Sequence, residues 1–212
     1  ENQKLIESYI KLKLSIYKKN PENEMTDNQI DMLIDFCNKV KDLAFENKLI
    51  KEKLLRFSNL EFYDLSDDQY EEAIKLSTKI SDSKMGSYFK NNMKKKDVYT
   101  KIIGYYSFWH YNKKSVWALN IKNDLTFTKI LAIDKNGTAL TESETGKIDI
   151  VKVDSEKAII KFSYNSNIDF YVDNSFISSK EIKKSKTEIW HFNLRTLRIN
   201  MRGDDVFIYQ KN

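Results

Sequence analysis

The chain has 212 residues, of which 41% are hydrophobic and 32% are charged. This balance is typical of a folded globular protein and excludes a disordered chain, which would bury too little apolar surface to offset the entropy of folding. The net charge of +5 comes from 32 lysines and four arginines against 31 acidic residues, and the excess is spread over both halves of the sequence. Proteins that bind nucleic acids usually concentrate their positive charge and rely on arginine. The even spread of lysines in this chain therefore argues against nucleic-acid binding.

The first part of the chain predicts two amphipathic helices. Apolar residues recur every three or four positions over residues 5–17, which predicts a helix that ends before Pro21. Thr26 and Gln29 have the spacing of a capping box, in which each side chain accepts a hydrogen bond from the other residue's backbone amide. This box predicts the start of a second helix, whose apolar stripe continues to about Phe57 with one break.

Further helices are predicted up to about residue 112. Ser66 and Gln69 repeat the capping-box spacing and open a third helix, and residues 84–96 favour a short fourth. Asp97 is a candidate N-cap of a fifth helix through residues 105–111, although the aromatic residues there also favour a strand. No repeat of 20–50 residues is recognised in this pattern.

From residue 115 onward the apolar residues alternate, which is the period of strands with one buried face. Short strands without intervening helices predict an antiparallel meander. The expected fold is therefore α+β, with four to five helices in residues 1–112 and about eight strands in residues 113–212. The strands are expected to form a closed or partly closed barrel, and the two regions are expected to pack together as one unit. The turn signals are Asn136-Gly137, Thr145-Gly146, Asn165-Ser166-Asn167 and Gly203-Asp204.

Catalytic and metal-binding motifs are absent from the sequence. A zinc site needs three or four Cys, His or carboxylate ligands at recurring spacing, whereas this chain has one cysteine and two histidines, His110 and His191. Cys37 lies on the apolar stripe of the second helix and is expected to be a buried core residue rather than a nucleophile. We therefore expect no enzyme activity, no metal and no cofactor.

No apolar run in the sequence is long enough to cross a membrane. The chain starts at Glu1 without a methionine, which favours a mature form whose leader has been removed over a fragment. An exported protein (periplasmic, surface or secreted) is therefore expected, with a cytoplasmic location as the alternative. The abundance of lysine, asparagine and isoleucine indicates a low-GC bacterium as the source.

Three of the four arginines lie in one predicted strand, residues 195–202. Arginine is enriched at protein interfaces because its planar fork pairs with carboxylates and stacks on aromatic rings. Arg195, Arg198 and Arg202 are therefore candidate partner-binding residues. The alternative is that the last two form cross-strand ion pairs with acids such as Glu188, which contribute little at a surface. The alternating apolar residues, which are expected to face the core, are Leu197, Ile199 and Met201.

The favoured function is non-enzymatic binding of another protein, as in accessory, adaptor or immunity-type proteins, which are commonly small and free of catalytic motifs. The first alternative is a carrier of a small apolar ligand, held in the mouth of the barrel near Trp117 and Trp190. The second alternative is binding of nucleic acid through the lysine-rich runs 94–96 and 183–186. A wide apolar cavity would favour the carrier, and a packed barrel would favour protein binding.

Overall fold

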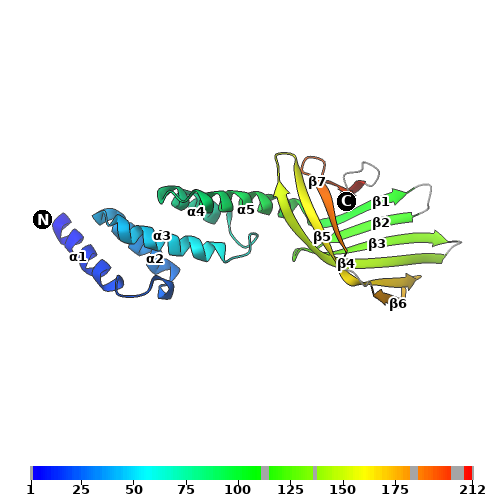
Figure 1. Ribbon diagram of the computed structural model, residues 1–212, viewed down its shortest axis with the longest axis horizontal. Coiled ribbons are helices and arrows are strands. Elements are labelled where there is room, and N and C mark those ends of the chain that lie inside the picture. Colours follow the sequence, from blue (N-terminus) through cyan, green and yellow to red (C-terminus); the bar gives the residue numbers. More distant parts are fainter. Residues whose placement is uncertain (1, 111–114, 136–137, 182–185, 202–207, 212) are drawn as a thin grey trace. The chain divides into compact units, whose positions relative to one another are not determined.

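The computed structural model describes residues 2–110, 115–135, 138–181, 186–201 and 208–211. The chain divides into two compact units, Glu1–Met93 and Lys94–Asn212. Within the described residues five α-helices are followed by nine strands, which confirms the predicted α+β fold (Figure 1).

Capping boxes start two of the helices, as the sequence predicts. Thr26 Oγ1 accepts a hydrogen bond from Gln29 N, and Gln29 Oε1 accepts one from Thr26 N. Ser66 and Gln69 form the same reciprocal pair. The helices are α1 (Asn2–Tyr17), α2 (Asp27–Val40), α3 (Leu43–Ser58), α4 (Asp67–Lys79) and α5 (Ser83–Ile102), with a short 3-10 turn at Glu22–Glu24.

The predicted break in the second helix lies at Lys41, which separates α2 from α3. Lys41 has a left-handed backbone (φ 59°), and the next residue, Asp42, caps α3 by accepting a hydrogen bond from an amide three residues on. The same arrangement follows α4, where Ser81 is left-handed (φ 57°) and Asp82 accepts a hydrogen bond from an amide of α5. Each pair of helices is therefore a hairpin that reverses direction at one left-handed residue.

These features recur at a fixed interval, since Thr26 and Ser66 lie 40 residues apart, as do Lys41 and Ser81. The pairs α2–α3 and α4–α5 are two copies of one helix hairpin, so the expectation that the chain contains no repeat is wrong. The repeat is hard to recognise in the sequence because it is carried by capping positions, by one left-handed residue and by the burial pattern. Stacked helix pairs of this kind form α-solenoids.

Helix α1 takes the place of a second helix in the same repeat. Its buried residues, Ile10 and Leu14, lie 40 positions before Ile50 and Leu54, which are buried on α3. Ile10 and Leu14 belong to one apolar cluster with residues of α2 and α3. The described residues thus contain one half of a helix pair followed by two complete pairs.

The change from helix to strand comes earlier than the expected boundary at residues 112–113. α5 ends at Ile102, and the aromatic stretch forms β1 (Gly104–His110) instead of a fifth helix. Its residues pair in register with β2, from Gly104 opposite Ile121, which satisfies the backbone of a segment whose side chains favour strand. The remaining strands are β2 (Ser115–Ile121), β3 (Thr126–Lys135), β4 (Thr138–Val153), β5 (Lys157–Val172), β6 (Ser175–Glu181), β7 (Thr187–Asn193), β8 (Arg198–Met201) and β9 (Ile208–Lys211).

All pairs of neighbouring strands are antiparallel, in the order β4-β3-β2-β1-β9-β8-β7-β5-β6. β4 also pairs with β5, so the sheet curls into a half-barrel (Figure 1). The strands β4 and β5 make this curl possible because each is 16 residues long and carries irregularities in register.

Two predicted turns are wrong, because Thr145-Gly146 lies inside β4 and Asn165-Ser166-Asn167 lies inside β5. Gly146 pairs with Tyr164, and a Cβ at Gly146 would lie 2.1 Å from Ser163 O and 2.8 Å from Cε1 of Phe127. Glycine is needed here for the close approach of two strands and a ring, and not for a turn. The other two turn signals, at 136–137 and 203–204, fall outside the described residues.

The interior of the half-barrel is built from aromatic side chains that the alternation predicts. Phe127, Phe162 and Trp190 are buried, with ring centroids 4.9 Å apart for the first two and 4.3 Å apart for the last two. The ring centroid of Tyr164 lies 5.0 Å from that of Phe127. Two of these rings, Tyr164 and Trp190, also lie beside the polar group described next.

Candidate functional site

The two tryptophans expected to line a ligand site do come together, around a buried lysine. The ammonium of Lys129, on β3, lies 5.2 Å from the ring centroid of Trp117, 5.4 Å from that of Tyr164 and 5.9 Å from that of Trp190. Lys129 is buried, and its Nζ lies 3.0 Å from Glu144 Oε2 on the neighbouring strand β4. Aromatic faces and one carboxylate together replace the water that a lysine ordinarily keeps.

A second lysine and a second carboxylate complete this group. Lys186 Nζ lies 3.2 Å from Glu144 Oε1 and 3.3 Å from Glu188 Oε1. Glu188 Oε2 accepts hydrogen bonds from Tyr164 Oη at 2.8 Å and from Trp190 Nε1 at 3.1 Å. We call Lys129, Glu144, Lys186 and Glu188 the buried charge cluster. Its two positive and two negative groups balance, so it is electrically neutral.

Burial and pairing act in opposite directions on the pKa values in this cluster. Burial lowers the pKa of Lys129, and the nearby Glu144 only partly offsets this effect. Burial alone would raise the pKa of Glu188, but the hydrogen bond from Tyr164 and the two ammonium groups hold it below its usual value. Glu188 therefore stays ionised to a lower pH than an ordinary glutamate does.

The space beside the cluster is small, and four of the six residues that line it are charged. A pocket of about 200 Å³ is lined by Trp117, Lys129, Leu131, Glu142, Glu144 and Lys186. Ligand sites usually span about 300–1,000 Å³ and are lined mainly by apolar groups. The lining of this pocket matches water or a small polar molecule better than it matches an apolar ligand.

The structure describes two of the three arginines predicted to bind a partner, and both follow the end of β7 at Asn193. Arg195 is exposed in the turn between β7 and β8, where its Nη2 lies 2.9 Å from Glu156 Oε1. It also lines a cleft of about 520 Å³ together with Lys94 and Lys101 of α5. Arg198 is exposed at the first position of β8, and Arg202 falls outside the described residues.

The predicted strand at residues 195–202 begins later than expected. Asn193 Oδ1 accepts hydrogen bonds from Arg195 N and Thr196 N, which fixes a four-residue turn before β8. Leu197 ends this turn with a left-handed backbone (φ 52°) and is only half-buried, so its expected place in the core is wrong. Ile199 is fully buried as predicted, and the side chain of Met201 is outside the described residues.

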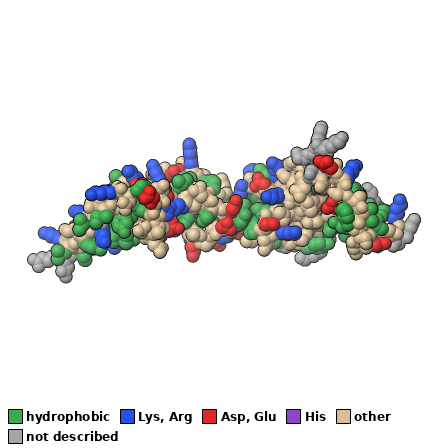
Figure 2. All heavy atoms as spheres, turned by 90° about the horizontal axis from the view of Figure 1, so that it is seen from below, with side chains coloured by type: hydrophobic (Ala, Val, Ile, Leu, Met, Phe, Trp, Pro, Cys, Tyr) green, Lys and Arg blue, Asp and Glu red, His purple; other side chains and the backbone are tan. Residues whose placement is uncertain are grey.

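An exposed apolar stripe on α1 is the feature that the sequence did not single out. Apolar residues with exposed fractions between 51% and 68% follow one another along this helix, although its other face is buried against α2. We call these residues the α1 face; they are Leu5, Ile6, Tyr9, Leu12 and Ile16. In Figure 2, hydrophobic side chains and lysines lie together on the surface at the end of the helical unit where the chain starts. The amphipathic period predicts the stripe, but no period tells whether a stripe is covered.

Three further features of the described residues bear on other kinds of chemistry: the groups that could bind a metal ion, the single thiol and the helices that could span a membrane. No group of three or more His, Cys, Asp or Glu side chains there is placed to hold a metal ion. Cys37 is buried on α2, and its burial, followed by the nearby Asp42 and Glu46, raises the pKa of the thiol to about 11. Among the same residues, no helix has both the length and the apolar character needed to cross a membrane.

Comparison of the chain with protein-family models, with curated proteins and with solved structures finds no match in any of the three.

Proposed function

We propose that this protein binds another protein without catalysing a reaction, and that the α1 face is the centre of the interface. The observation that carries the proposal is the run of five exposed apolar side chains on a single helix. Contiguous apolar surface rimmed by charged groups is characteristic of protein-binding sites, whereas scattered apolar residues are not. Lysines flank the α1 face, with Lys4 and Lys11 along one edge of the helix and Lys13 beside Tyr9.

The geometry gives less support to the two alternatives. An apolar ligand beside Trp117 would have to lie against the ammonium of Lys129, which favours polar partners. Nucleic-acid binding would need free lysines, and in the run 183–186 the described lysine, Lys186, is paired with Glu144 and Glu188. The other two lysines of that run lie outside the described residues. The first lysine run, residues 94–96, lies on α5 with two of its three side chains half-buried. The abundance of lysine, asparagine and isoleucine adds a low-GC bacterial source to the proposal.

The proposal is tested by affinity capture from the native source with the tagged 212-residue chain. Tyr9→Asp places a charge in the middle of the α1 face, and Leu55→Ser is the control, because Leu55 is similarly exposed on α3 and lies 40 residues after Ser15. Far-UV circular dichroism should show that both variants keep their helices, since both positions are exposed.

A partner that co-purifies with the wild type and with Leu55→Ser, but is lost with Tyr9→Asp, supports the proposal. A partner retained by Tyr9→Asp at wild-type yield would show that the α1 face is not the interface.

A further inference from the structure

We propose that the α1 face receives an acidic amphipathic helix of the partner protein, which lies antiparallel to α1 in the position that α2 takes on α3. This inference rests on the proposed function and adds the chemistry and direction of the bound segment. It follows from the 40-residue repeat, because the repeat shows which element covers the equivalent face of α3.

The burial of α3 and α1 differs at the positions that contact a first helix. Phe45, Glu46 and Leu49 are buried on α3, and Phe45 and Leu49 share one apolar cluster with Leu33 and Cys37 of α2. The residues 40 positions earlier on α1 are Leu5, Ile6 and Tyr9, which are all exposed. The face that α2 covers on α3 is therefore uncovered on α1.

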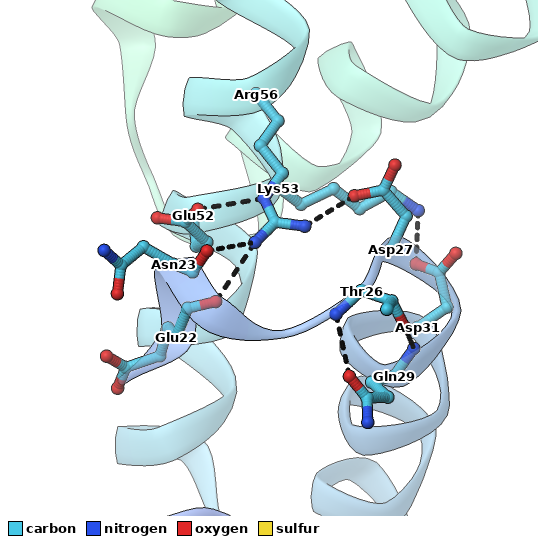
Figure 3. A network of polar contacts seen from close by, with 9 residues as sticks. All are labelled: Glu22, Asn23, Thr26, Asp27, Gln29, Asp31, Glu52, Lys53 and Arg56. Atoms are coloured by element: carbon cyan, nitrogen blue, oxygen red, sulfur yellow. Dashed lines mark hydrogen bonds and ion pairs between the residues drawn. The ribbon is translucent and has the colours of Figure 1, made fainter. Parts of the chain in front are cut away.

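Polar contacts between α2 and α3 fix the direction of the pair (Figure 3). Arg56, near the end of α3, lies 2.7 Å from Asp27 at the start of α2, and it donates a hydrogen bond to Glu22 O just before that helix. Lys53, one turn earlier on α3, forms an ion pair with Asp31. A helix bound to α1 in the same way would start beside Ile16 and end beside Leu5.

The charges of the repeat determine which helix fits. The first helices are acidic: α2 carries three aspartates and one lysine, and α4 carries four acidic residues and two lysines. The second helices are basic, and α1 matches them with three lysines and one glutamate. An acidic helix therefore complements α1, whereas a second copy of α1 would bring lysines against lysines.

Lys13, whose ammonium lies 5.6 Å from the ring centroid of Tyr9, offers the docking site a charged group. It stands 40 residues before Lys53, whose ammonium is paired with Asp31 of the first helix and with Glu72 of the next pair. On α2, the position equivalent to Glu72 is occupied by Met32. A carboxylate for Lys13 is thus expected from the incoming helix, at the position that Asp31 holds in α2.

The opposite end of the repeat, at α5, lacks an equivalent apolar face. On α5, the positions equivalent to the buried Ile50 and Leu54 of α3 are held by Lys90 and Lys94, and both lysines are exposed. Terminal repeats with a polar outer face are the usual way to end a solenoid. Of the two ends of the described helical repeat, the α1 end carries the exposed apolar residues that another helix could cover.

The proposal is tested with a fluorescent synthetic peptide that has the sequence of residues 25–42 with Cys37→Ser, which is an acidic amphipathic helix of the required kind. Fluorescence anisotropy measures its binding to the full chain and to the variants Lys13→Glu, Tyr9→Asp and Leu55→Ser. We expect binding that is weakened at least tenfold by the first two substitutions and unchanged by the third. A peptide with Asp31→Lys should bind poorly to the wild type and regain affinity for Lys13→Glu.

An 18-residue helix is marginal in isolation, so a fused form provides a second measurement. A copy of residues 25–42 replaces Glu1 and Asn2 and is joined directly to Gln3, which keeps the 40-residue frame and raises the effective concentration of the added helix. Hydrogen exchange over residues 3–17 should slow at least tenfold relative to the wild type. A fusion whose Asp27, Asp31 and Asp35 are changed to lysine should show much less protection.

Three results would overturn the inference. The first is no protection in the acidic fusion together with no specific binding of the peptide. The second is a dimer of the 212-residue chain that Tyr9→Asp dissociates, which would make a second copy the occupant. The third is a longer native chain whose residues ahead of Glu1 already protect α1. If the native partner is lost with Tyr9→Asp but is indifferent to Lys13→Glu, the proposed function stands and the acidic helix is wrong.

Discussion

Adding a single methyl group at Gly146 should markedly lower the free energy of unfolding of the β unit. It lies inside β4 opposite Tyr164, and an added Cβ would come within 2.1 Å of Ser163 O and 2.8 Å of Phe127. Carbon and oxygen atoms in ordinary contact lie about 3.3 Å apart, so the backbone of β5 would have to move by about 1 Å. The ring of Phe127 cannot make room, because it packs against Phe162.

The expected cost follows from two opposing effects. Overpacking of this kind destabilises a protein by about 1–3 kcal/mol, and the rigid backbone oxygen places Gly146→Ala at the upper end. Replacing glycine by alanine also restricts the unfolded chain, which offsets about 0.4–1 kcal/mol. The net loss in the free energy of unfolding is then about 2 kcal/mol, and the melting temperature should fall by about 8 °C.

The assay is urea denaturation followed by tryptophan fluorescence, since all three tryptophans of the chain lie in Lys94–Asn212. Gly86→Ala is the matched control, because a Cβ there would meet only Ser77 Cβ, at an ordinary 3.6 Å, inside a helix. This control should be neutral or stabilising by about 0.5–1 kcal/mol in the helical unit, monitored by circular dichroism at 222 nm. Unfolding of Gly146→Ala at the same urea concentration as the wild type would refute the close packing of β4 against β5.

Three further predictions concern the caps, the thiol and the buried charge cluster. Thr26→Ala should lower the stability of the helical unit by about 1 kcal/mol because it removes the capping box, while Thr78→Ala on the exposed side of α4 should change it by less than about 0.5 kcal/mol; equal effects would contradict the role of the cap. Cys37 should react with a thiol reagent much more slowly in native buffer at pH 8 than in denaturant, since a thiol with a pKa of about 11 is ionised in only about one molecule in a thousand at that pH; equal rates would show that the thiol is accessible. The lowered pKa of Glu188 means that its contribution to stability is complete above the pKa of the unfolded chain and is lost as the pH falls through the lower folded value, so Glu188→Gln should flatten the acid side of a plot of stability against pH; an unchanged acid side would show that other carboxylates determine it.

The helices could be predicted largely from local chemistry, because a capping box or a period of 3.6 is visible within a few residues of sequence. The boxes at Thr26 and Ser66 and the break near Lys41 were accessible in this way. The 40-residue repeat was not recognised, although Asp42 and Asp82 stand in equivalent positions, because the apolar residues between them vary freely in size.

The strands could be predicted as a class, but not where they end. Thr145-Gly146 has the composition of a turn, yet Gly146 serves the contact between two long strands. Leu197 fits the alternation of the last arginine-rich segment, yet the turn held by Asn193 shifts the start of β8 beyond it. In both cases the structure depends on a contact with a side chain or a neighbouring strand. The local pattern of apolar residues does not indicate where that side chain or strand lies.

The candidate sites were accessible only in part, since pairing across a sheet depends on register. Trp117 and Trp190 were expected near one another, but Lys129, which contacts both rings, was not singled out. The alternation of β3 places it on the same face as Phe127, yet a lysine in a strand gives no sequence signal of burial. The exposed state of the α1 face could not be predicted, because a sequence period reports an apolar stripe and not the element that covers it.

The difference between the two ends of the helical repeat limits how such a protein can change its length. A copy of residues 25–64, inserted after Asp64, would keep the 40-residue frame but would place Met32 where Lys53 now meets Glu72. We therefore expect a 40-residue insertion in the interior of the array to fold with the loss of that ion pair. A copy added after α5 would instead meet Lys90 and Lys94 where it needs aliphatic side chains. Duplication of a helix pair is therefore expected to be tolerated inside the array and not at the end that carries Lys90 and Lys94. The number of helix pairs should then change by insertion between existing pairs.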